Sequence, residues 1–234
     1  MSKDISILFS GGPDSTLATL YALQKADRVH LHTYHHLWMS MTSNHKKVIA
    51  ELREKFGAER IVEHEAQIDT LFKKCYFTGS SKRLKKYRTF YIPWICGACK
   101  LAMHATTIAY NRLHDIDTTY DGANVESSAY FAEQTDSYYA AMKEFYRSIG
   151  MQCEHPVYQV ERTDIETEKF GLITTKNTKK EHVFFSTQHT CPIGLLVHAH
   201  ARLYYRPFRG KNRLNRFAGE VLEQTIADCR SFFP

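Results

Sequence analysis

The chain has 234 residues, of which 43% are hydrophobic and 24% are charged. This composition is ordinary for a globular protein with one substantial core, and it excludes an intrinsically disordered chain. No apolar run reaches the roughly 18 to 20 residues that cross a bilayer, and the first 15 residues lack a signal-type hydrophobic stretch. We therefore expect a cytoplasmic protein that does not engage a membrane.

Positive charge is concentrated in two stretches of the chain, whose formal net charge is +6. The first stretch has no acidic residue and contains Lys73, Lys74, Lys82, Arg83, Lys85, Lys86 and Arg88. The second contains Arg202, Arg206, Arg209, Lys211, Arg213 and Arg216, interleaved with Tyr204, Tyr205, Phe208 and Phe217. Such patterns are typical of surfaces that bind phosphates and stack on unpaired bases, and equally of a solvated loop and a solvated helix face.

Strand and helix patterns alternate along the chain. Strand patterns at residues 5–9, 28–34 and 60–64 are separated by helical patterns at 15–24 and 43–56, the second capped by Ser43. A helix at 96–113, a strand at 117–121 and helices at 136–148 and 162–170 follow, with Thr163 as the cap of the last. A strand at 183–187 and a helix at 215–233 complete the pattern. This order predicts an α/β fold with a parallel sheet covered by helices on both faces.

Residues 70–92 interrupt this alternation. They are basic, contain Gly79, Ser80 and Ser81, and follow neither a helical nor a strand period. We predict that they form an insertion that acts as a lid or a substrate arm.

The segment SGGPDST, residues 10–16, directly joins the first strand to the first helix. Backbone N–H groups and the positive end of a helix dipole converge at such a junction, which favours a bound anion. Gly11 and Gly12 allow the main chain to approach phosphates closely. Hydroxyl donors come from Ser10, Ser15 and Thr16. Asp14 can cap the helix or help to hold Mg²⁺.

This segment is neither a Walker A loop nor the dinucleotide fingerprint. It resembles the SGGxDS signature of the PP-loop ATP pyrophosphatases, with Pro13 at the variable position. The resemblance implies a Rossmann-like (HUP-type) sheet and a loop that binds the pyrophosphate part of ATP, with Asp14 and Ser15 as catalytic residues. It also implies that adenine rests against the end of the second strand, near His32 and Tyr34.

A second glycine turn, Gly122-Ala123-Asn124, follows the strand at 117–121. It resembles the second glycine-containing turn of the same family, which makes Gly122 a nucleotide contact and Asn124 a catalytic candidate. A role for Asn124 as a helix cap stays open. From this turn to Gly171 the layout is similar to that of 7-cyano-7-deazaguanine synthase.

Cys96 and Cys99 form a CxxC pattern at the start of a helix, beside Lys100, and Cys191 follows much later. Three cysteines from a helix and a distant loop can bind three irons of a [4Fe-4S] cluster and leave the fourth iron open. A zinc site completed by a histidine such as His189, a redox dithiol and simple packing are the alternatives.

This cysteine pattern resembles that of the cluster-dependent tRNA thiolation enzymes, although the flanking zinc fingers of the 2-thiouridine enzymes are missing. The four-cysteine zinc site of 7-cyano-7-deazaguanine synthase is missing too. We expect Cys75, Cys153 and Cys229 to be buried, with Cys153 as a candidate persulfide carrier. Residues 1–190 are predicted to form the PP-loop ATP-binding domain, and residues 191–234 a C-terminal element that completes the active site.

The leading hypothesis is an ATP-dependent sulfur transferase that adenylates a nucleobase carbonyl in tRNA and releases pyrophosphate. Its cofactors would be ATP, Mg²⁺ and a [4Fe-4S] cluster, with Zn²⁺ as the alternative. A sulfur donor protein and a homodimer are further expectations. The rival hypotheses are an amidating or nitrile-forming ligase and a non-catalytic nucleotide-binding module.

Overall fold

The computed structural model describes residues 3–36, 44–87, 92, 94–172, 191–205 and 211–233. Five strands form one sheet in the order β3-β2-β1-β4-β5, and every neighbouring pair is parallel. The strands are β1 (Asp4–Leu8), β2 (Arg28–His35), β3 (Ile61–Gln67), β4 (Thr118–Asp121) and β5 (Gln152–Glu154). The predicted α/β fold with a parallel sheet is confirmed.

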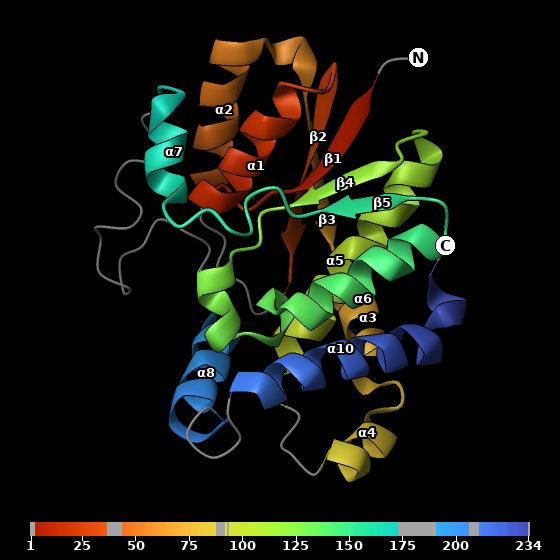
Figure 1. The fold of residues 1–234 in the computed structure, drawn as a ribbon. Coiled ribbons are helices and arrows are strands. Elements are labelled where there is room, and N and C mark those ends of the chain that lie inside the picture. The colour runs from red at the N-terminus through yellow and green to blue at the C-terminus, as the bar shows by residue number, and fades with distance from the viewer. Residues whose placement is uncertain are drawn as a thin grey trace.

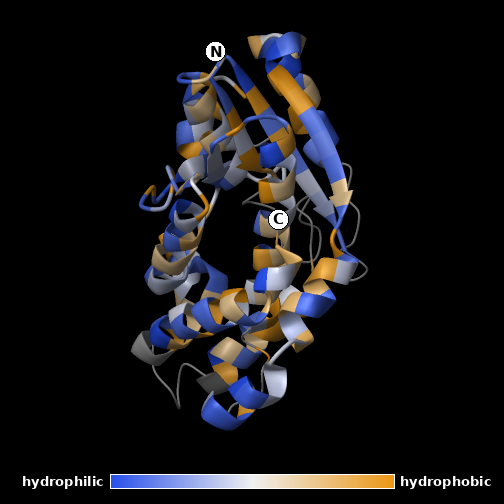
Figure 2. Ribbon diagram, turned by 90° about the vertical axis from the view of Figure 1, so that its right-hand side faces the viewer, coloured by the Kyte–Doolittle hydropathy of each residue, from blue (hydrophilic) through white to orange (hydrophobic). Residues whose placement is uncertain are grey.

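Helices cover both faces of this sheet (Figure 1). The longer ones are α1 (Pro13–Leu23), α2 (Asn44–Phe56), α3 (Asp69–Phe77), α4 (Ser80–Tyr87), α5 (Trp94–Leu113), α6 (Asp136–Ser148), α7 (Thr163–Lys169), α8 (Pro192–His200) and α10 (Lys211–Asp228). The short turns are η1 (Ala58–Arg60), η2 (Val125–Ala129), η3 (Ala132–Gln134), the π-helical η4 (Ala201–Tyr205) and η5 (Arg230–Phe232). Hydrophobic and hydrophilic residues mix along these helices, as expected where one face packs on a core (Figure 2).

Each face of the sheet has its own hydrophobic core. On one face, Leu17 of α1 and Leu52 of α2 pack with Val29 of β2 and with the segment that contains α7. On the other face, α5 and α6 pack against α3 and α10 around residues such as Trp94 and Tyr138. The continuous apolar runs of β1 and β2 follow from this two-sided burial.

The structure differs from the sequence predictions in three elements. The insertion at 70–92 is not irregular, because its described part forms α3 and α4. Strand β5 was not predicted, since it has three residues and buries only Cys153. Helix α8 was not predicted either, and the predicted strand at 183–187 lies outside the described residues.

Helix α10 lies along α6 and brings the C-terminal element onto the core. Its inward face includes Leu214, Phe217 and Val221, and the Ser137 N–H at the start of α6 donates to Asn215 Oδ1 at 3.0 Å. None of the helices within the described ranges combines the length and apolarity that a bilayer span requires.

Candidate active site

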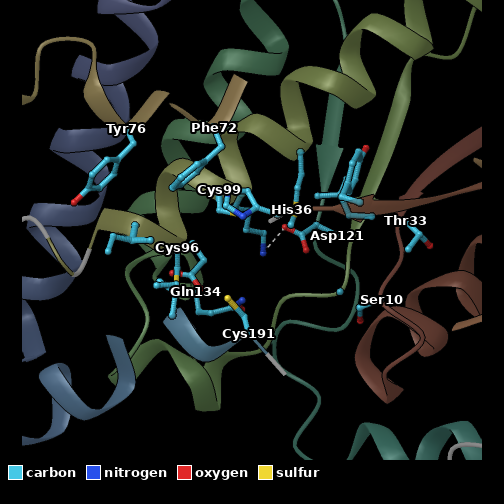
Figure 3. A pocket seen from close by; sticks show the side chains of 18 of the residues that line it. Ser10, Thr33, His36, Phe72, Tyr76, Cys96, Cys99, Asp121, Gln134 and Cys191 are labelled. Carbon is cyan, nitrogen blue, oxygen red and sulfur yellow. Dashed lines mark ion pairs between the residues drawn. The ribbon is translucent and has the colours of Figure 1, made fainter. Parts of the chain in front are cut away.

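A cavity of about 610 Å³ lies at the carboxyl ends of β1, β2 and β4. In the sheet, β1 lies between β2 and β4. The strands that follow β1 in the chain, β2 and β3, lie on one side of it, and the later strands β4 and β5 lie on the other, so the direction of the strand order reverses at β1. Open α/β sheets bind their ligands at such a switch point. Figure 3 shows Ser10 on one side of the cavity and Cys96 and Cys191 on the other, with Asp121 between them.

The glycine turn after β1 is folded tightly at one end of the cavity. Gly11 has a φ of +75°, and a Cβ there would lie 2.6 Å from the Cα of His45, so only glycine fits. Pro13 opens α1, where its missing N–H costs no hydrogen bond. Ser15 Oγ donates to the Gly12 carbonyl at 3.1 Å and accepts from the Ser10 N–H at 3.2 Å. The hydroxyls of Ser10 and Ser15 therefore line the cavity from a fixed turn.

The other two polar residues of this turn point elsewhere. Thr16 is fully buried, and its hydroxyl donates to the Gly12 carbonyl at 2.8 Å. Asp14 accepts a hydrogen bond from Thr163, the first residue of α7. Thr163 thus ties α7 to the turn instead of capping its own helix, because Arg162 occupies the cap position.

Gly122 brings the second glycine turn against the first. A Cβ at this position would lie 2.6 Å from Ser15 N and 2.7 Å from Ser15 Cα, so the two turns are in backbone contact. Asn124 is buried outside the cavity wall, where its Oδ1 accepts from the Glu126 N–H and its Nδ2 donates to the Val160 carbonyl. The structure therefore gives Asn124 the capping role, and Asn124 does not line the cavity.

The end of β2 presents Tyr34 to the cavity, as predicted, but not His32. The His32 ring lies deeper in the core, with Nε2 3.0 Å from Ser6 Oγ and Nδ1 3.3 Å from His64 Nδ1. His32 and Tyr34 face the same side of β2. His32 is farther from the carboxyl end of the strand, and the ring of Tyr110 of α5 packs against it. At the end of β2 the cavity is therefore lined by Tyr34 and its neighbour Thr33, and not by His32.

The three cysteines of the predicted site all line this cavity. Cys96 and Cys99 come from the first turns of α5, and Cys191 from the residue before α8. Burial raises the pKa of Cys96 and raises that of Cys99 to about 12, so without a metal both thiols keep their protons. Cys75, Cys153 and Cys229 are buried, as expected.

The ligand atoms of these three cysteines do not all lie within 4.8 Å of one another, as those of a preformed zinc site would. Zn–S bonds of about 2.3 Å in a tetrahedron put the sulfurs roughly 3.8 Å apart. Among the described residues, three ligand atoms lie within 4.8 Å of one another only at His45, Glu63 and Glu65. Three thiolates on three different irons stand farther apart than three thiolates on one zinc ion. His189, the histidine of the zinc alternative, lies outside the described residues.

Sequence reasoning missed a buried charge network between the two ends of the cavity. Asp121 Oδ2 lies 2.8 Å from Lys100 Nζ, 3.4 Å from His104 Nε2 and 3.9 Å from His155 Nδ1. Burial acts to raise the pKa of Asp121, but Lys100 and the two histidines outweigh it and hold this pKa below its ordinary value. Burial lowers the pKa of His155 to about 3. The sequence marked only Lys100, as a neighbour of Cys99.

Glu133 is a second unpredicted residue of the cavity. It is 91% buried within η3, and burial raises its pKa to about 7. Its Oε2 has no hydrogen-bond partner in the described part of the chain. Nothing in the sequence around Glu133 signals this position, because its burial depends on the packing of distant segments.

No protein-family model matches the chain, and no curated protein sequence matches it. Among solved structures, a 4-thiouridine synthetase in complex with RNA and bound ATP superposes with a TM-score of 0.52 at 16% identity. The fold is similar to that of this synthetase. The match covers 96% of this chain and 53% of the synthetase chain, so this chain spans about half of the synthetase's length. At this identity the likeness establishes the fold alone.

The basic insertion divides into exposed and buried cations. Lys82 and Lys85 of α4 are exposed, whereas Arg83 is 1% exposed and pairs with Asp228 at 2.7 Å. Arg83 therefore anchors α4 to α10 and is not available for phosphates. In the second basic stretch Arg202 and Arg216 are exposed, and Arg206, Arg209 and Phe208 lie outside the described residues.

Proposed function

We propose that this protein is an ATP-dependent sulfur transferase that adenylates a carbonyl oxygen of an RNA nucleobase and replaces this oxygen with sulfur. One observation carries the proposal: the glycine turn with Ser10 and Ser15 and the three cysteines line the same cavity. Activation by ATP and delivery of sulfur can therefore act on one bound group without moving it, which is the main requirement of a two-step exchange.

The ATP end of the cavity is assigned from the turn and β2. The glycine turn and the start of α1 would bind the phosphates, because the hydroxyls of Ser10 and Ser15 and the positive end of the α1 dipole lie at this end of the cavity. Tyr34 and Thr33 would border the adenosine. Mg²⁺ would neutralise the phosphates and pyrophosphate. Asp14 lies outside the cavity wall and would act by holding α7 to the turn through Thr163.

Lys100 supplies a fixed positive charge between the two ends. Its ammonium is held at 2.8 Å by Asp121 and faces the cavity. An oriented cation in a water-poor site stabilises the negative charge that develops on phosphate and carbonyl oxygens. Lys100 would thus favour both adenylation and departure of AMP.

Cys96, Cys99 and Cys191 would hold a [4Fe-4S] cluster. When bound, the cluster would supply an open iron that accepts sulfide, and the chain would position the target beside it. The sulfide would come from a separate sulfur donor. The exposed lysines of α4 and the described arginines of the C-terminal element would contact RNA phosphates. The crystal structure of a 4-thiouridine synthetase in complex with RNA and bound ATP supports this choice of partners.

Anaerobic turnover tests the proposal. The reconstituted protein is incubated with ATP, sulfide and bulk tRNA, and both pyrophosphate and thiolated nucleosides are measured. We expect RNA-dependent pyrophosphate release together with a sulfur-containing nucleoside. Pyrophosphate release that requires ammonia and leaves the RNA without sulfur would favour the amidating or nitrile-forming ligase. The absence of pyrophosphate release would favour a non-catalytic nucleotide-binding module.

A further inference from the structure

Two adjacent residues of η3, Glu133 and Gln134, line the cavity, and each has a polar atom with no hydrogen-bond partner among the described residues. Glu133 is 91% buried, and its Oε2 has no hydrogen-bond partner within the described part of the chain. An unpartnered carboxyl oxygen is costly to bury, so its position calls for a partner such as a ligand, an ion or a water molecule, or for a catalytic role.

The side chain of Gln134 is held in one orientation. Its Oε1 accepts from the Asn124 N–H at 3.1 Å and from the Tyr139 hydroxyl at 2.9 Å. Its amide nitrogen makes no hydrogen bond to the described residues and carries two donors. Figure 3 shows Gln134 beside Cys96 and Cys191. A carboxyl acceptor and an amide donor thus both belong to residues that line the cavity which also holds the three cysteines.

We propose that Glu133 and Gln134 bind the amide edge of the target ring, which is a ring N–H next to a carbonyl group. The N–H donates to Glu133, and the carbonyl oxygen accepts from Gln134. This inference rests on the proposed function and specifies its substrate: a lactam-type base, such as uracil, and not cytosine, whose N3 has no hydrogen.

The same contacts account for proton movement in the reaction. The carbonyl oxygen forms a bond to the α-phosphorus of ATP as the bond from this phosphorus to pyrophosphate breaks. The ring N–H proton passes to Glu133, and the ring C–N bond becomes C=N. Hydrosulfide then adds to the carbon, the C–O bond breaks and AMP leaves. The hydrogen of hydrosulfide becomes the new ring N–H beside C=S, and the proton held by Glu133 is released with the pyrophosphate.

A Glu133→Gln variant tests this assignment, with Glu126→Gln as the matched control because Glu126 is exposed in the neighbouring η2. The variants are compared with the wild type in bulk-tRNA-dependent pyrophosphate release, ATP binding and bound iron. We expect Glu133→Gln to lower the rate about 100-fold, as loss of a proton acceptor does, while ATP affinity and iron stay unchanged. Gln134→Leu should raise the apparent KM for tRNA with a smaller effect on kcat.

Two results would overturn the inference while leaving the proposed function intact. The first is a rate of tRNA-dependent pyrophosphate release in Glu133→Gln that is less than threefold below that of an active wild type. The other is a thiolated nucleoside that mass spectrometry identifies as a cytidine derivative. A Glu133→Gln variant that loses iron would instead make Glu133 a ligand of the cysteine site, which also contradicts the assignment. A wild type without RNA-dependent pyrophosphate release would remove both proposals.

Discussion

The ammonium of Lys100 lies 2.8 Å from the carboxylate of Asp121, and this ion pair joins the two ends of the cavity. Lys100 directly follows Cys99 on α5, and Asp121 directly precedes Gly122 at the end of β4. The pair therefore fixes the cysteine-bearing helix relative to the second glycine turn, which contacts the glycine turn after β1. Both residues are largely buried, so the interaction is only weakly screened by solvent.

Removing one partner of this pair should destabilise the protein more than removing both. Lys100→Met leaves a buried carboxylate without its cation, which we expect to lower the free energy of unfolding by about 3 kcal/mol. Lys100→Met combined with Asp121→Asn should recover a large part of this loss. Urea unfolding of the two single variants and the double variant measures the coupling, and additive effects would argue against an ion pair in solution.

The backbone contact between the two glycine turns predicts that a methyl group added at Gly122 lowers both stability and ATP affinity. Gly122→Ala puts its Cβ against the backbone of Ser15, where neither turn can yield without moving the proposed ATP site. We expect a loss of about 1 to 3 kcal/mol in stability and a marked loss of ATP affinity. Gly150→Ala is the control, since its Cβ meets nothing within 4 Å, although a φ of +79° strains the backbone. Equal ATP affinity in both variants would contradict the contact.

Burial of His32 predicts acid lability. Burial, and then the charge of His64, lower the pKa of His32 from 6.5 to about 3. The unfolded chain therefore binds a proton below pH 6.5 that the folded chain does not, so stability falls as the pH drops from 6.5 towards 3. Between pH 6.5 and pH 5 this residue should cost about 2 kcal/mol. Denaturant unfolding at pH 7.5 and pH 5 should show a flatter dependence for His32→Gln, and an unchanged dependence would refute the assignment.

The sequence predicted the elements that depend on local pattern. The glycine turn after β1 was recognisable because its strand, turn and helix are consecutive, and the convergence of Cys96, Cys99 and Cys191 on one cavity was anticipated from resemblance. The structure adds what depends on contacts between distant segments. Burial of Glu133, the pairing of Lys100 with Asp121 and the displacement of His32 from the cavity follow from how α5 and η3 pack, and no short pattern encodes them.

The division of cations in α4 predicts two different outcomes for neighbouring residues. Lys82→Ala with Lys85→Ala should reduce the slope of log affinity for tRNA against log salt by about one to two units, without loss of stability. Arg83→Ala should instead destabilise the protein by about 3 kcal/mol, because it removes a buried side chain and leaves Asp228 without its cation. Filter binding over a range of salt concentrations and thermal unfolding separate the two effects. A slope unaffected by the lysine changes would remove α4 from the RNA surface.

The iron content of anaerobically reconstituted cysteine variants tests the central claim most directly. The wild type should hold about four irons per chain and absorb near 400 nm, as a [4Fe-4S] protein does. Cys96→Ser, Cys99→Ser and Cys191→Ser should each lose most of this iron, whereas Cys153→Ser, changed at a buried position outside the cavity wall, should keep it. Full iron in Cys191→Ser, or a colourless wild type that binds a single zinc ion, would contradict the account.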